Sequence, residues 1–135
     1  MIAGNKAVVR RFVEAVVNRG DPRVLAELVA PDRVRHAPDG DLYGPEGVRI
    51  DVAEWRSGLP DLHLEVADQV AEADRVATRF VLRGTHLGPF LGLVPTGRPV
   101  AVAGVSVDRL AGGRLAEAWP CLDALGLLRQ VRARP

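Results

Sequence analysis

The residues best suited to chemistry lie near the end of the chain, between residues 114 and 123. In a strand, Trp119, Cys121 and Asp123 share one parity and point to the same face. If that face borders an apolar cavity, loss of hydration disfavours the charged Asp123 carboxylate, which then becomes a better acceptor for a carbon-bound proton. We therefore expect Asp123 to be a catalytic acid/base, with Trp119 and Cys121 contacting the substrate. Asp123 also directly precedes a leucine-rich segment, so it is equally a candidate helix N-cap, and the two roles are compatible.

Further candidates for substrate contacts come from aromatic residues and one histidine. Phe80 lies on the predicted inner face of the segment 75–85, and Trp55 lies on the apolar face of a predicted helix. Phe90 belongs to an apolar stretch rich in Gly and Pro, which is predicted to be a loop that covers another part of the molecule. His86 stands at a strand end beside this loop and is predicted as a structural or lid residue.

The spacing of apolar residues predicts helices first and a sheet afterwards. A period near 3.6 predicts three helices, over residues 8–17 up to Gly20, from Asp21-Pro22 to a stop at Pro31, and from Pro45 to Gly58 and Pro60. A period of two predicts strands over 62–67, 75–85, 98–110 and 114–122, after an extended piece at 33–36 and before a short helix from Asp123. Segregated helices and strands predict an α+β fold, with the helices on one face of a curved antiparallel sheet. Such a sheet encloses an apolar cavity, a common place for a small-molecule ligand.

Composition limits the classes of protein and of partner. The chain has 135 residues, which predicts one domain over 1–135. Eighteen basic against seventeen acidic residues leave a net charge of +1, which gives no reason to expect nucleic acid or a membrane surface as partner. A single cysteine excludes an internal disulfide, and no cluster has the spacing of metal ligands. With no leader pattern and no apolar stretch approaching ~20 residues, the expected location is cytoplasmic.

Four groups of residues in this order are similar to the SnoaL-like polyketide cyclase family, within the NTF2-like superfamily. They are residues 5–12 with 18–21, 83–88, 91–97, and 113–119 with 123–128. The resemblance implies a cone-shaped α+β barrel that is often dimeric and binds an apolar, oxygenated, polyketide-like molecule inside. It also implies ring closure by intramolecular aldol addition without metal or cofactor, with an aspartate near the end of the last long strand as acid/base. Asp123 matches that position.

The resemblance also bears on His36 and Cys121. His36 resembles the family's cavity histidine after the second helix, which implies hydrogen-bond donation to an enolate oxygen. Cys121 stands where characterised cyclases of the family carry a histidine. We therefore expect a cofactor-independent cyclase or isomerase, a homodimer, with Asp123 and His36 catalytic. Two alternatives stay open, a non-catalytic binding module of the same fold and an epoxide-type hydrolase in which Asp123 with Arg79 or Asp108 holds a water.

Overall fold

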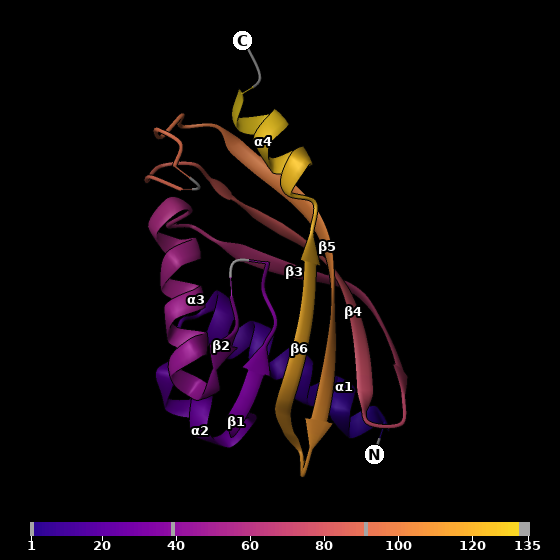
Figure 1. The fold of residues 1–135 in the computed structure, drawn as a ribbon. Helices are drawn as coiled ribbons and strands as arrows, with labels where there is room; N and C mark the ends of the chain where they lie inside the picture. The colour runs from indigo at the N-terminus through magenta and orange to yellow at the C-terminus, as the bar shows by residue number, and fades with distance from the viewer. Residues whose placement is uncertain (1, 39, 91, 133–135) are drawn as a thin grey trace.

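The computed structural model describes residues 2–38, 40–90 and 92–132 and has an α+β architecture (Figure 1). The helical elements are α1 (Ile2–Arg11), the π-helical η1 (Phe12–Asn18), the 3-10 turn η2 (Pro22–Val24), α2 (Leu25–Leu28), α3 (Gly44–Gly58) and α4 (Ala124–Arg132). The strands are β1 (Val29–Arg35), β2 (Leu42–Tyr43), β3 (His63–Glu72), β4 (Arg75–Thr85), β5 (Pro99–Ala111) and β6 (Arg114–Leu122). Among the described residues, no helix is long and apolar enough to cross a membrane.

The strands form one open, curved sheet in the order β2-β1-β6-β5-β4-β3. The predicted meander is confirmed, because β3 to β6 pair with their sequence neighbours in antiparallel fashion. The exception to the antiparallel prediction is β1, which pairs with β6 in parallel. Gly112 and Gly113 connect β5 to β6 with φ angles of 59° and 77°, the left-handed pair that a tight hairpin turn requires.

The second helix ends earlier than its apolar spacing predicts. Leu28 is the last residue of α2, and Val29 has φ −116° and ψ 124°, which is extended backbone. Pro31 therefore lies inside β1 instead of ending a helix. The prediction was wrong here because buried Val29 satisfies the apolar pattern equally well as the first residue of a strand.

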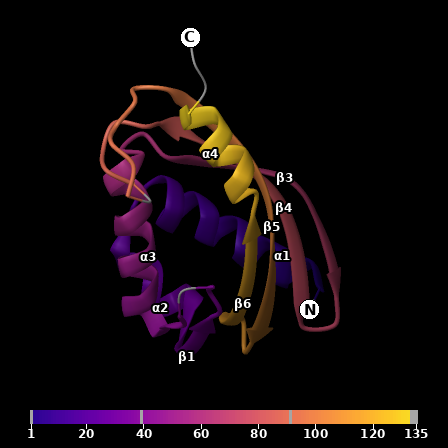
Figure 2. The ribbon, with the colours of Figure 1, turned by 45° about the horizontal axis from the view of Figure 1, so that its top comes forward.

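The helices lie on the concave side of the sheet, with α4 beyond the end of β6 (Figure 2). Along β4 the predicted alternation is confirmed, since Val76, Thr78, Phe80 and Leu82 are all buried. On η1, the Asn18 side chain donates to the backbone oxygen of Leu64 at 3.0 Å and accepts from its N–H at 2.7 Å. This pair of hydrogen bonds attaches the N-terminal helical segment to β3.

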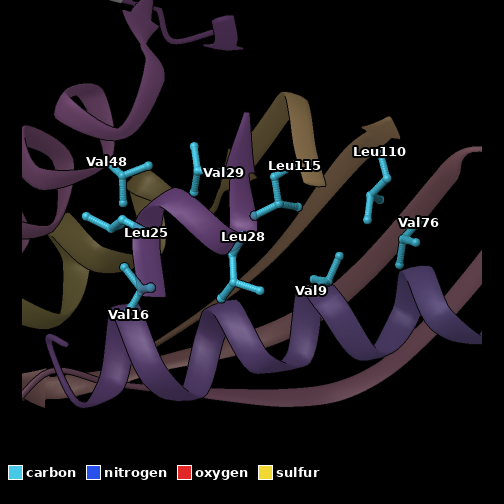
Figure 3. Close-up of a cluster of buried hydrophobic side chains, with 9 residues drawn as sticks. All are labelled: Val9, Val16, Leu25, Leu28, Val29, Val48, Val76, Leu110 and Leu115. Carbon is cyan, nitrogen blue, oxygen red and sulfur yellow. The ribbon is translucent and has the colours of Figure 1, made fainter. Parts of the chain in front are cut away.

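Two clusters of buried apolar side chains form the core. In the first, Val9 and Val16 point from the N-terminal helical segment toward Leu28 (Figure 3). The second lies around Phe80 and Phe90 and includes residues of α4 such as Leu127. Burial of each such side chain contributes roughly 1.5–3 kcal/mol. Between them these clusters fix the helices, the loop after β4 and α4 against the sheet.

Candidate active site

A cavity of about 170 Å³ lies between the N-terminal helices and the concave face of the sheet. Its wall is mostly apolar and includes residues of both core clusters. For comparison, an apolar cavity of about 150 Å³ accommodates benzene. A larger substrate would therefore have only one or two rings enclosed. Six polar or charged side chains also line the cavity: Arg33, Arg35, Asp51, Thr78, Ser106 and Asp108.

Asp108 is a buried carboxyl group on β5, with 6% of its surface exposed. Asp108 is one of the alternate residues of β5 that point to the concave face. It follows Ser106 and precedes the buried Leu110, each by two residues. Burial raises the pKa of Asp108 to about 6, while the charge of Arg33 and a hydrogen bond from the Ser106 hydroxyl oppose this shift. A carboxyl group with such a pKa exchanges protons near neutral pH, as an acid/base catalyst must.

Arg33 on β1 brings a buried positive charge to the same cavity. It is 5% exposed, and its guanidinium carbon lies 5.7 Å from the centroid of the Phe12 ring. Burial lowers the pKa of Arg33, whereas the carboxylates of Asp108 and Asp51 act to raise it. An arginine stays charged under these conditions. Its Nε is buried and has no hydrogen-bond partner among the described residues.

An ion pair connects β1 to α3 at the cavity wall. The Nε of Arg35 lies 3.0 Å from Oδ2 of Asp51, and both side chains are largely covered. The two charges neutralise each other locally. The charge balance of the cavity therefore depends on Arg33 and on the protonation state of Asp108.

The predicted face of β6 points away from this cavity. β6 contributes Ala118, Pro120 and Leu122 to the cavity wall, so by strand alternation Trp119 and Cys121 point to the opposite face. Cys121 is exposed there. The premise that this parity borders the cavity is therefore not met, because the helices cover the other side of the sheet.

His36 belongs to a cluster on that opposite face. Its Nε2 lies 2.6 Å from Oε2 of Glu117, and its ring stacks on Trp119 with centroids 5.4 Å apart. Arg75 covers the same indole at 5.0 Å. The hydrogen bond to Glu117, supported by the charge of Asp41, raises the pKa of His36. The cluster fastens the end of β1 to β6.

Asp123 is exposed and caps the C-terminal helix. Its Oδ1 accepts a hydrogen bond from the backbone N–H of Gly126 at 2.8 Å, which confirms the N-cap prediction. Its side chain is exposed and is not among the residues that line the cavity. Its predicted catalytic role stays a prediction that must be tested by activity.

The remaining predicted contact residues lie at different distances from the cavity. Phe80 and Trp55 line it. Phe90 packs on the Trp55 ring, with centroids 4.8 Å apart. His86 is fully buried beneath the loop after β4, where its Nδ1 lies 3.0 Å from the Thr96 hydroxyl. His86 thus holds the loop, and Phe90 supports a wall residue.

The sequence analysis named Asp108 only as a partner in the hydrolase alternative and assigned no role to Ser106 or Arg33. A signal for the two β5 residues existed, because they continue the row of buried Val102 and precede buried Leu110 at the same parity. No comparable signal existed for Arg33, whose strand does not alternate regularly. In the described part of the chain, no group of three or more His, Cys, Asp or Glu side chains is arranged to hold a metal ion.

This α+β architecture, an open sheet with helices over its concave face and a cavity between them, is an NTF2-like fold. The family model for SnoaL-like polyketide cyclases matches residues 7–131, and the chain belongs to this family. It is 32% identical to the aklanonic acid methyl ester cyclase AcmA of Streptomyces galilaeus, over 93% of this chain and 88% of that protein.

Solved structures show the same fold. A SnoaL-like protein from Jannaschia sp. CCS1 superimposes with a TM-score of 0.89 at 27% identity, covering 99% of this chain and 95% of that one. TsrD from Streptomyces laurentii superimposes with a TM-score of 0.86 at 32% identity, covering 98% of this chain and 97% of that one. The likeness therefore spans nearly the whole chain, helices and sheet included.

Proposed function

We propose that the protein is a cofactor-independent cyclase that closes a ring of a polyketide-type substrate, with Asp108 as the acid/base. The observation that carries the proposal is a buried carboxyl group, with a pKa of about 6, in the wall of an otherwise largely apolar cavity. Family membership and the likeness to AcmA, whose name describes a cyclase of aklanonic acid methyl ester, support the reaction class.

The proposed reaction is an intramolecular aldol addition. The Asp108 carboxylate removes a proton from the carbon between two carbonyl groups, and the electron pair of that C–H bond forms an enolate. The enolate carbon then attacks another carbonyl group of the same molecule, which forms the new C–C bond and an alkoxide. The Asp108 carboxylic acid returns its proton to the alkoxide, so atoms and charge balance and the product has the mass of the substrate.

The surroundings of Asp108 suit this chemistry. Ser106 donates a hydrogen bond to its carboxylate and so restricts its orientation. Trp55 and Phe80 provide flat apolar walls, against which a planar substrate can stack. The mostly apolar wall of the cavity also offers few hydrogen-bond partners to water beside the enolate.

The test compares Asp108→Asn with Asp123→Asn and wild type on linear and partly cyclised polyketide esters. Products are separated by liquid chromatography, and their masses are measured by mass spectrometry. We expect Asp108→Asn to lower kcat by about 10²–10⁴-fold, the usual range for losing an acid/base group, and Asp123→Asn to keep turnover. The exposed Arg83→Gln serves as a matched surface control.

The same assay decides between competing assignments. Full activity of Asp108→Asn together with inactivity of Asp123→Asn would refute our assignment in favour of the sequence-based prediction. His36→Gln tests the second predicted catalytic residue, and we expect turnover to persist because its ring lies on the opposite face of the sheet. Tight substrate binding without turnover in wild type would instead indicate a binding module.

A second candidate reaction is hydrolysis of an epoxide. The observation that favours it is the placement of Arg33 near two carboxylates, those of Asp108 and Asp51. One carboxylate would take a proton from a water molecule that attacks the ring carbon, and a protonated carboxyl group would donate to the ring oxygen as the C–O bond breaks. Hydrolysis adds 18 mass units and retains label from ¹⁸O-water, whereas ring closure does neither.

A further inference from the structure

Arg33 carries a donor that the folded chain itself leaves unused. Only 5% of the surface of Arg33 is exposed, and the residue lines the cavity. Its buried Nε has no hydrogen-bond partner in the described part of the chain. Buried polar groups are nearly always paired, so such a donor needs an explanation, and a ligand acceptor inside the cavity supplies one.

The charges that face Arg33 come from three elements. Arg35 lies on β1 itself, Asp51 on α3 and Asp108 on β5. Arg35 and Asp51 form their own ion pair at 3.0 Å. When Asp108 holds a proton, the two arginines and Asp51 together carry a net charge of +1, and a bound anion would restore neutrality.

We propose that Arg33 binds a delocalised oxyanion of the substrate, either a carboxylate or the enolate of a 1,3-dicarbonyl unit, and that the cavity takes up one proton with it. This inference rests on the proposed function for the identity of the site. A guanidinium offers planar N–H donors that match two oxygens sharing one negative charge. The Phe12 ring lies close to the guanidinium and restricts where it can turn. Asp108 receives the proton, because an anion beside it disfavours a second negative charge.

The first experiment measures binding without turnover. Isothermal titration calorimetry at pH 6 to 7 compares 2-naphthoate with 2-nitronaphthalene, which has a similar shape and no net charge. We expect wild type to bind the carboxylate at least tenfold more tightly. The double variant Arg33→Met/Asp108→Asn removes both buried charges and should bind the two probes equally, with the neutral probe proving that its cavity is intact. Arg83→Gln, which replaces an exposed arginine on β4, should behave as wild type.

Proton uptake is measured by repeating the titrations in two buffers of different ionisation enthalpy. Naphthoate binding should take up a proton in wild type, and the uptake should vanish in Asp108→Asn. A third probe, 1-phenylbutane-1,3-dione, tests the enolate. Its enolate absorption band should appear in wild type below the pH at which the free diketone ionises, and it should be lost in the double variant. Binding of naphthoate alone identifies a carboxylate ligand, and the enolate band alone identifies the dicarbonyl unit.

The inference is overturned if wild type binds neither anionic probe, or binds charged and neutral probes equally, or if the preference survives in the double variant. Its failure is distinguishable from failure of the proposed function. Loss of turnover in Asp108→Asn with no anion preference refutes the role of Arg33 alone. Anion preference with full turnover in Asp108→Asn refutes the acid/base assignment alone.

Discussion

Replacement of Asp108 by asparagine should change how the stability of the protein depends on pH. In the folded state the pKa of this buried carboxyl is raised to about 6 from its ordinary 3.8. The folded protein therefore binds its proton more tightly than the unfolded chain, and stability falls as the pH rises from about 4 to 6. A shift of about two pKa units corresponds to about 3 kcal/mol, which is fully lost above the folded-state pKa.

The difference in unfolding free energy between Asp108→Asn and wild type isolates this one group. We expect that difference to rise by about 2 kcal/mol in favour of the variant between pH 4 and pH 7, since asparagine does not titrate and the unfolded carboxyl is already partly ionised at pH 4. The size of that difference at any one pH also includes the lost attraction between Asp108 and Arg33. Only its change with pH reports the titration of Asp108. Urea denaturation followed by far-UV circular dichroism at intervals of one pH unit measures it.

Asp68→Asn provides the matched control, because Asp68 is an exposed carboxylate paired with Arg79 at 2.9 Å. Its difference from wild type should stay within about 0.5 kcal/mol across the range. A difference for Asp108→Asn that does not change with pH, or that changes in the opposite direction, would refute the reasoning. Asp108 would then be a permanently ionised partner of Arg33 and unsuited to accept and return a proton near neutral pH.

Three further predictions concern the cap, the loop and the outer face of the sheet. Asp123→Ala should lower the unfolding free energy by about 1 kcal/mol through loss of the N-cap, measured by urea denaturation, while a loss of more than half of kcat would argue for a catalytic role. Gly88→Ala should cost about 1–3 kcal/mol, because a Cβ there would overlap the Ser57 carbonyl oxygen; unchanged thermal stability would contradict this packing. Light scattering should detect the predicted homodimer. Val105 is a 40% exposed apolar residue on β5 that pairs with the exposed Cys121 of β6. If this face of the sheet forms the interface, Val105→Arg should give monomers.

Local patterns in the sequence were sufficient for most of the secondary structure. The strand 75–85 was predicted with the observed bounds, and its alternation of buried and exposed residues follows from the two-residue period of a strand. The strands predicted at 98–110 and 114–122 left only a short turn, occupied by Gly112 and Gly113, and Asp123 marked the start of the last helix; both features depend on backbone geometry within a few residues. The boundary between α2 and β1 was missed, since one apolar valine suits either element.

The position of the site was decided by tertiary structure. Alternation shows that Trp119 and Cys121 share a face of β6, but it cannot show which face the helices cover, and they cover the other one. Arg33 and Asp108 are 75 residues apart in the sequence. They approach each other only because β1 pairs with β6 and β6 pairs with β5. Local patterns thus predicted most of the elements and the motifs predicted the family, whereas the meeting of these two charges in one cavity arises from contacts between distant strands, which no local pattern encodes.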